Sequence, residues 1–152
     1  MLNKEGQREL AYVVRVDDIK PIEGKDRVEC AVVNGWTCMI PKNQFKAGDL
    51  GIYFEIDSKL PEVEPWTSME FLASKHFKIK TQKLRGELSQ GFLASVESLG
   101  WEQHEIDGHK FITRPDKVHP NITSTIDNLY EGDFLTKELG VTYAVVEDNS
   151  RK

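Results

Sequence analysis

The sequence predicts a mostly β protein, a small barrel of five or six short strands with one or two short helices and a polar C-terminal extension. Three observations lead to this prediction. Short runs rich in β-branched and aromatic residues recur over residues 10–96, and turn residues separate them. An Asn-Gly pair joins two of these runs, which is typical of a tight hairpin. Signals for helix starts and stops are sparse.

The individual strands follow from these runs. Strands are expected at 11–16, 27–33, 36–40, 50–56, 77–84 and 91–96. Pro21 and Gly24 interrupt the chain after the first of them, and Pro41 ends the third because it lacks an amide donor.

The Asn34-Gly35 turn also fixes a register for the two cysteines. With these two residues as the loop, Ala31 faces Cys38 across the hairpin and Cys30 faces Met39. Successive side chains of a strand alternate between faces, so the two thiols point to opposite sides of the sheet. The register therefore excludes a disulfide.

The segment 77–84 alternates in polarity. Phe77 and Ile79 share one face of the expected strand, whereas Lys78 and Lys80 share the other. Leu84 falls on the polar side of this alternation, which predicts a bulge near Gln82 and Lys83.

Helices are expected only at 69–75 and at 133–139, the second ending at Gly140. Residues 100–128 are polar and weakly patterned, which predicts an extended insertion. Many short strands in about 90 residues favour a small closed barrel, with the OB-fold as the leading candidate. The domain boundaries expected from this reading are a barrel at 1–96, an extension packing on it at 97–146 and a linker at 147–152.

Composition limits the class of protein. The 152 residues suffice for one domain with a core, and no apolar run approaches the roughly 18 residues of a membrane span. The N-terminal residues lack the apolar stretch of a secretion signal, so we expect an intracellular, soluble chain without a membrane partner.

The charge is unevenly distributed. The whole chain carries −5, but residues 75–91 hold five cations and one anion, a net of +4, which leaves −9 on the remainder. A basic patch on an acidic body can still bind a polyanion, because local patches matter more than totals.

The common catalytic and nucleotide-binding motifs are missing, including GxxxxGK[ST], GxGxxG, GxSxG and HExxH. We therefore expect no catalytic residue and no metal site. Lys78, Lys80, Lys83 and Arg85 remain as the candidate site, because cations about 6–7 Å apart along a strand suit successive phosphates. The same lysines are also typical of a solvated outer strand face, and residue chemistry alone leaves both readings open.

Four blocks of the chain, in order, resemble a known family. They are 10–26 leading into Asn34-Gly35-Trp36, then 45–58, then FKIKTQKLRGELSQG at 77–91, and finally 139–142. Together they resemble the N-terminal OB module of the nick-sealing, ATP-dependent RNA ligases.

The resemblance implies a partner and roles for these residues. The partner would be nicked duplex RNA, held by Lys78, Lys80, Lys83 and Arg85. Ser89 and Gln90 could donate hydrogen bonds to phosphate or a 2′-hydroxyl, or could equally serve a turn between strands. Trp36 could stack on a sugar or base, although packing against the core is the commoner fate of such a residue.

The chain departs from the family at the chemical step. These ligases adenylylate a lysine in a Kx[DHN]G motif, and Lys137-Glu138-Leu139-Gly140 has the spacing but a leucine at the polar position. ATP and a divalent metal, Mg²⁺ or Mn²⁺, would therefore belong to a nucleotidyltransferase domain joined in cis after Lys152. This chain itself would need no cofactor.

Two other classes remain open. Residues 21–27 also resemble the opening of tRNA-binding domains, so a free-standing module for tRNA or single strands is one alternative. A protein-interaction barrel whose basic face docks an acidic partner is the other.

We expect purified residues 1–152 to form no stable lysyl-adenylate with labelled ATP, because no lysine lies in the required motif. Denaturing electrophoresis after incubation with ATP and Mg²⁺ or Mn²⁺ measures this. A band that survives denaturation in the wild type and disappears in Lys137→Ala would contradict the expectation.

Overall fold

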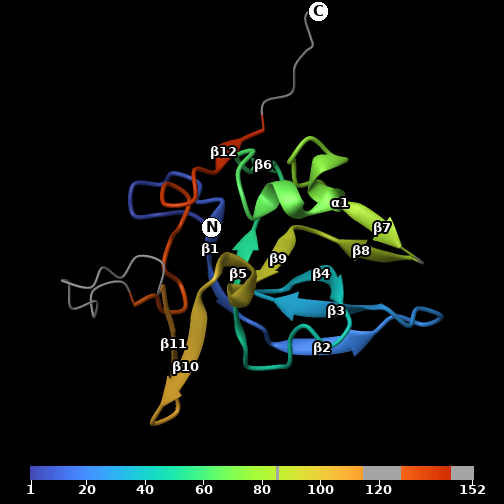
Figure 1. The fold of residues 1–152 in the computed structure, drawn as a ribbon, viewed down its shortest axis with the longest axis horizontal. Coiled ribbons are helices and arrows are strands. Elements are labelled where there is room, and N and C mark those ends of the chain that lie inside the picture. Colours follow the sequence, from blue (N-terminus) through green and yellow to red (C-terminus); the bar gives the residue numbers. More distant parts are fainter. Residues whose placement is uncertain (85, 115–127, 145–152) are drawn as a thin grey trace, which may run out of the picture.

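Two three-stranded antiparallel sheets form the centre of the protein in the computed structural model, which describes residues 1–84, 86–114 and 128–144 (Figure 1). The first sheet has the order β1 (Ala11–Arg15), β5 (Leu50–Phe54), β9 (Phe92–Ser95). The second has the order β2 (Asp18–Pro21), β3 (Val28–Val33), β4 (Trp36–Pro41). The strands expected from the sequence at these places are confirmed, and β2 is an additional one.

The first sheet is buried on both faces. Tyr12, Tyr53 and Leu93 point into a core shared with the second sheet, where Ala31 and Cys38 meet them. The opposite face carries the larger core, whose members include Val13, Ile52 and Phe54 of the sheet and Trp66, Leu72 and Ile112 of the segments that cover it. Burial on both faces explains why β1 and β5 read as continuous apolar runs.

The chain passes from the first sheet to the second without a loop. The amide of Val16 donates to the carbonyl of Asp49 (2.8 Å), which extends the pairing of β1 with β5. The next amide, that of Asp17, donates to Val32 (2.8 Å) at the end of the β2–β3 ladder. One nearly continuous strand thus joins both sheets. In the described chain β4 and β9 share no ladder, although the amide of Gln90, two residues before β9, donates to the Thr37 carbonyl of β4 (2.8 Å).

The Asn34-Gly35 hairpin has the expected register. Both turn residues have positive φ, 49° and 81°, and Val33 pairs with Trp36. Cys30 pairs with Met39 and Ala31 with Cys38, and both thiols are free. The prediction that no disulfide forms is confirmed.

Smaller elements surround the two sheets. They are β6 (Ser58–Lys59), a 3-10 turn (Trp66–Ser68), α1 (Glu70–Ala73), β7 (Gln82–Leu84), β8 (Glu87–Ser89), a second 3-10 turn (Val96–Leu99), β10 (Glu102–Ile106), β11 (His109–Thr113) and β12 (Thr142–Tyr143). The described chain is therefore mostly β with one short α-helix, and none of its helices has the length and apolar character needed to cross a membrane.

The strand expected at 77–84 is wrong as a continuous element. His76 and Phe77 have φ of 56° and 63°, so the backbone turns where the strand was expected to begin. Lys78 then forms a single antiparallel bridge with Lys59, and a regular strand resumes only at β7. The alternation itself is real, because Phe77 and Ile79 are buried while Lys78 is half-buried.

The helix expected at 133–139 is also wrong. Tyr12 bridges Phe134, and the amide of Leu135 donates to Ala11 (2.8 Å), so the chain is extended along the free edge of β1. One helical turn follows, closed by the amide of Leu139 on Leu135 (2.9 Å). Pairing with β1 holds the first residues of the expected helix in an extended conformation.

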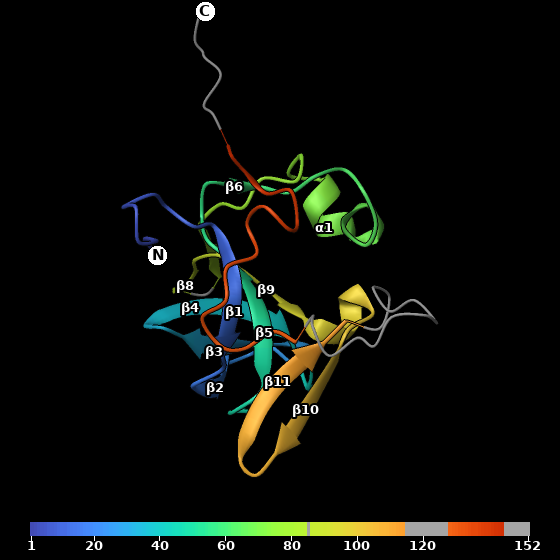
Figure 2. The same ribbon diagram turned by 90° about the vertical axis from the view of Figure 1, so that its left-hand side faces the viewer.

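The insertion expected at 100–128 contains a hairpin instead. β10 and β11 pair around Asp107-Gly108 and project below the central sheets in Figure 2. Residues 115–127 lie outside the described part of the chain.

A close approach of Tyr53 to Gly91 connects β5 to the segment that precedes β9. The Tyr53 hydroxyl donates to the Gln90 carbonyl, and burial raises the pKa of this phenol. Gly91 has φ of 106°, and a Cβ there would overlap the Tyr53 ring. Both the backbone conformation and the space demand glycine.

We expect Gly91→Ala to lower the free energy of unfolding by about 2–4 kcal/mol, combining a positive-φ cost with overpacking. Gly35→Ala is the control, because φ there is 81° and no atom lies within 4 Å of the new Cβ. The Gly35→Ala substitution should lower the free energy of unfolding by only about 1 kcal/mol. Equal losses in urea unfolding would show that the Tyr53 contact is unimportant.

Candidate nucleic-acid interface

Three lysines line one small hollow of about 100 Å³ at the junction of α1, β8 and β9. They are Lys75, Lys78 and Lys80, and Gln82 lies beside them. Lys75 lies in the turn after α1. Lys78 is bridged to β6, and it points away from the core because its neighbours Phe77 and Ile79 point into it. The hollow is thus cationic at its rim and apolar at its base, where Leu72, Ile79 and Phe92 lie.

Lys59 adds a fourth cation. It is directly opposite Lys78 in the antiparallel bridge, where the Ile79 amide donates to Ser58 (2.8 Å) and the Leu60 amide to Phe77 (2.9 Å). Opposed residues project to the same face of a sheet, and like charges there repel. Among the described residues none of the four lysines forms an ion pair. An anion bound here would relieve the repulsion.

Ser89 and Gln90 have structural roles. The Ser89 hydroxyl, almost fully buried, accepts the amide of Met39 (2.9 Å), and the Gln90 amide donates to Thr37 (2.8 Å). Thr37 in turn donates through its hydroxyl to Leu88 (2.8 Å). These bonds attach β8 to the edge of β4. Ser89 also lines the lysine hollow, and Gln90 is half-buried next to it in sequence.

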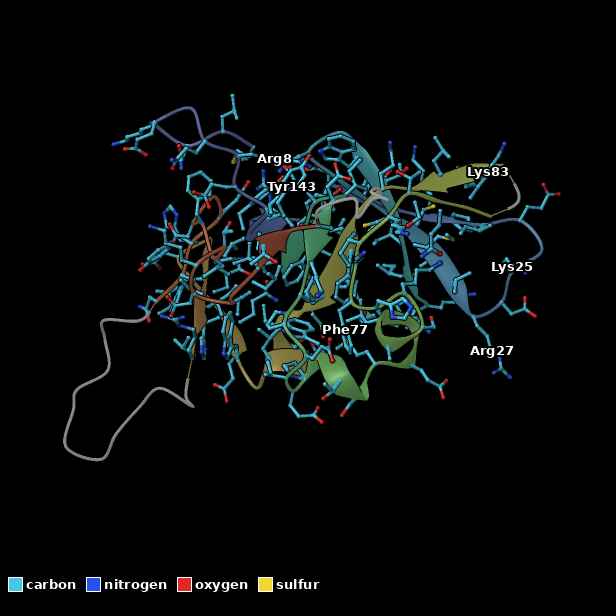
Figure 3. All side chains as sticks on the ribbon, turned by 90° about the horizontal axis from the view of Figure 1, so that it is seen from above. Arg8, Lys25, Arg27, Phe77, Lys83 and Tyr143 are labelled. Carbon is cyan, nitrogen blue, oxygen red and sulfur yellow. The ribbon has the colours of Figure 1, made fainter. Side chains whose placement is uncertain are left out.

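The other expected contacts are spread more widely. Lys83 is exposed on the β7–β8 hairpin and lies toward the same side of the molecule as Lys25 and Arg27 (Figure 3). Trp36 packs, half-buried, against the core between the sheets. Arg85 lies outside the described residues. Of the expected phosphate contacts, the structure therefore gathers Lys78 and Lys80 in one place.

Sequence reasoning missed Lys59 and Lys75 as members of this cluster. Lys75 belongs to the basic stretch 75–91 and could have been included on charge alone. Lys59 has no such signal, because only the pairing of β6 with Lys78 brings it near. In the part of the chain that the structure describes, no three His, Cys, Asp or Glu side chains gather in a way that could hold a metal ion.

Comparison with known proteins decides the family. A model of an OB-fold domain family matches residues 10–96, which is more than half of the chain. The chain belongs to this OB-fold family. The match covers both central sheets and the lysine cluster, and the mostly β OB-fold expected from the sequence is confirmed. The described strands form two separate sheets, so the closure of the expected barrel is not seen as a continuous ladder among them.

The OB-fold domain is also similar to part of Naegleria gruberi RNA ligase. The structure of that ligase with pyrophosphate is 30% identical, with a TM-score of 0.67, over 95% of this chain and 37% of the ligase. A mutant of the ligase with AMP and manganese gives 30% identity and a TM-score of 0.64 over 90% of this chain and 35% of the ligase. The chain thus spans little more than a third of that enzyme. A comparison with curated protein sequences gives no match.

A buried carboxylate supports the strand that carries Lys59. Glu55, 6% exposed, directly follows β5 and accepts hydrogen bonds from the Tyr12 hydroxyl of β1 and from the Arg8 guanidinium (Nε to Oε1, 3.0 Å). The amino terminus of Met1 also contacts it. Arg8 further donates to the carbonyl of Ile56 (2.7 Å). These bonds hold the turn that leads into β6.

Arg8 also reaches the C-terminal strand. Its guanidinium lies 5.6 Å from the ring centroid of Tyr143 in β12, and the two are neighbours in Figure 3. β12 pairs with β6, and the Ala144 amide donates to Asp57 (2.7 Å). The OB-fold domain therefore fixes Lys59 between β12 on one side and Lys78 on the other.

Burial favours the neutral form of Glu55, but hydrogen bonds from the amino terminus, Tyr12 and Arg8 outweigh it and lower the pKa of the carboxyl. A carboxyl whose pKa is lower in the folded than in the unfolded protein stabilises the fold above its ordinary pKa. That stabilisation is lost as the pH falls through the lowered value.

We expect Glu55→Gln to destabilise the domain by about 2 kcal/mol at pH 7, the range of hydrogen bonds to a charged group. The difference in free energy of unfolding between the variant and the wild type should shrink below pH 4.5, the ordinary pKa of a carboxyl group. It should vanish at a pH below the lowered pKa of Glu55. Glu62→Gln, which removes the same charge from an exposed side chain, should change little. A difference independent of pH in chemical unfolding would contradict this assignment.

Proposed function

We propose that this chain is the nucleic-acid-binding OB domain of an ATP-dependent RNA ligase that seals 3′-hydroxyl/5′-phosphate nicks in duplex RNA. The observation that carries the proposal is the convergence of four lysines without ion pairs among the described residues, from β6, the turn after α1 and the bridge region. The similarity of the chain to part of an RNA ligase supports RNA as the anion that this cluster binds. The domain grips the RNA, and the chemistry belongs to a nucleotidyltransferase domain in cis.

The physical basis of the grip is electrostatic. Each lysine that neutralises a phosphate releases a condensed counterion, so binding weakens with salt and depends little on sequence. Lys78 and Lys80 are the central contacts of the proposal, with Lys59 and Lys75 beside them. Lys83, which is exposed on the β7–β8 hairpin, extends the proposed contact, and Arg85, two residues further along the sequence, is a further candidate. The acidic remainder of the chain would orient this face toward the RNA.

The remaining expected residues take smaller parts in the proposal. Ser89 keeps a hydroxyl hydrogen to donate after accepting the Met39 amide, so it can still reach a phosphate at the lysine hollow. Gln90 can offer its side-chain amide. Trp36 is half-buried against the core between the sheets, so only the exposed part of its ring could stack on a base. In this proposal ATP and Mg²⁺ or Mn²⁺ bind to the catalytic domain.

We expect Lys78→Ala/Lys80→Ala to lower the salt dependence of binding to a labelled nicked RNA duplex. The four lysines of the cluster, if each neutralises one phosphate, give a log–log slope of about −3 to −4, which contacts by Lys83 and Arg85 would make steeper. Removing two of the four should reduce the magnitude of the slope by about 1.4–1.8. Affinity in the wild type should lie in the weak range of about 10⁻⁴ to 10⁻⁶ M, measured by fluorescence anisotropy from low to moderate salt.

Lys4→Ala/Lys137→Ala is the matched control. It removes the same charge from two exposed lysines of another groove, which Glu5, Glu9 and Glu138 also line. The control should leave the slope unchanged. If both double variants behave like wild type, or both lose the same amount, the lysine hollow is not the RNA contact.

A further inference from the structure

A second, mostly apolar hollow lies between β4 and β9, where the two sheets share no ladder in the described chain. Its volume is about 350 Å³, near the lower limit for small-molecule pockets. Met39, Ile40 and Pro41 form one wall, and Leu93 and Ala94 form the other. A pocket of this size suits one planar group rather than a chain of them.

The apolar hollow adjoins the lysine hollow. Met39, Phe71 and Phe92 line both, so the two form one groove that is apolar at one end and cationic at the other. The cationic end carries Lys75, Lys78 and Lys80. A ligand that fills this groove combines a flat, largely apolar body with a negative charge next to it.

The aromatic side chains of the groove are held in place. Phe92 stacks on Phe54 (centroids 5.5 Å apart) and meets the edge of Trp66 (6.2 Å), so the larger core fixes its ring. Phe71 of α1 packs edge-to-face on Phe92 (5.2 Å) yet remains 49% exposed. An exposed, immobilised phenyl ring beside lysines is a typical stacking platform for a base.

The walls add hydrogen-bonding capacity. β4 and β9 are not paired to each other at this groove, although the Thr37 carbonyl and the Met39 amide of β4 are already bonded to Gln90 and Ser89. The capacity therefore lies in the remaining backbone groups of the two strands. Edge strands carry backbone donors and acceptors, and a nucleobase can use them through its polar rim, as can an extended peptide. The adjacent lysines favour the nucleotide, because a peptide has no phosphate to place on them.

We propose that this groove receives one unpaired nucleotide of the RNA, its base against Phe71 and Met39 and its phosphates at Lys75, Lys78 and Lys80. The inference rests on the proposed function and adds to it. The lysines hold the backbone of any RNA, whereas the apolar end distinguishes an RNA with a nucleotide out of the helix from one that is fully paired.

The test compares two labelled RNAs that differ by one unpaired nucleotide at the nick. We expect Phe71→Ala to weaken binding of the RNA with the unpaired nucleotide about five- to thirty-fold. Affinity for the fully paired nicked duplex and both salt slopes should stay within about twofold of wild type. A 2-aminopurine at the unpaired position should lose fluorescence on binding to the wild type and not to the variant.

Two further variants control for folding and for exposed aromatic surface. Phe71→Tyr keeps the ring and should bind both RNAs like wild type. Tyr130→Ala removes a ring of similar exposure, 51%, from a different hollow and should have no effect. Thermal unfolding of all variants shows that each is folded at the assay temperature.

The outcomes separate this inference from the proposed function. If Lys78→Ala/Lys80→Ala weakens both RNAs but Phe71→Ala binds both like wild type, the groove holds no nucleotide and only the inference is wrong. A protein or peptide occupant would give the same result. Equal weakening of both RNAs by Phe71→Ala would mean that α1 merely positions Lys75. If neither variant changes RNA binding, the proposed function is wrong as well.

Discussion

The buried carboxylate of Glu55 adds side-chain bonds where β1 and β5 are already paired, and it attaches the N-terminal segment to both strands. Through Tyr12 and Arg8 it links the first strand and the N-terminal segment to the end of β5. A charged group so little exposed is stable only while its partners remain, because burial without them would be costly. Because Arg8 also donates to the carbonyl of Ile56, the same bonds hold the turn into β6. They thereby help to fix the position of Lys59 relative to Lys78.

The lysine cluster is therefore a tertiary feature rather than a row along one strand. β6 is only two residues long, and α1 only four, so neither element would be stable in isolation. The larger core holds them through Leu60, Leu72 and Phe77. Packing energy in the core is thus what keeps like charges close together on the surface, and it leaves them available to an anion.

How much the sequence could predict depended on how local the signal was. Asn34-Gly35 fixed a whole register because the turn type and the strand pairing are both local properties. Asp107-Gly108 is an equally local turn signal, and both residues have positive φ, 54° and 79°. The hairpin was not predicted because the strands on either side of this turn are polar and lack the apolar pattern of a strand. The start of the segment 77–84 depends on the bridge between Lys78 and Lys59, which are 19 residues apart, and no pattern within the segment could predict that pairing. The lysines Lys78 and Lys80 were predictable from alternation, whereas the apolar groove requires β4 and β9 to be placed side by side.

The second edge of β1 has a consequence for how the chain folds. Residues 132–136 occupy that edge, with Leu135 donating to Ala11 and Leu10 donating to the hydroxyl of Thr136 (3.0 Å). These contacts span more than 120 residues, so the entropy of closing a very long loop is lost before they form. During synthesis one edge of β1 keeps its backbone groups unpaired until residues 132–136 have been made. A fragment ending at residue 96 would keep that open edge permanently and would tend to associate through it.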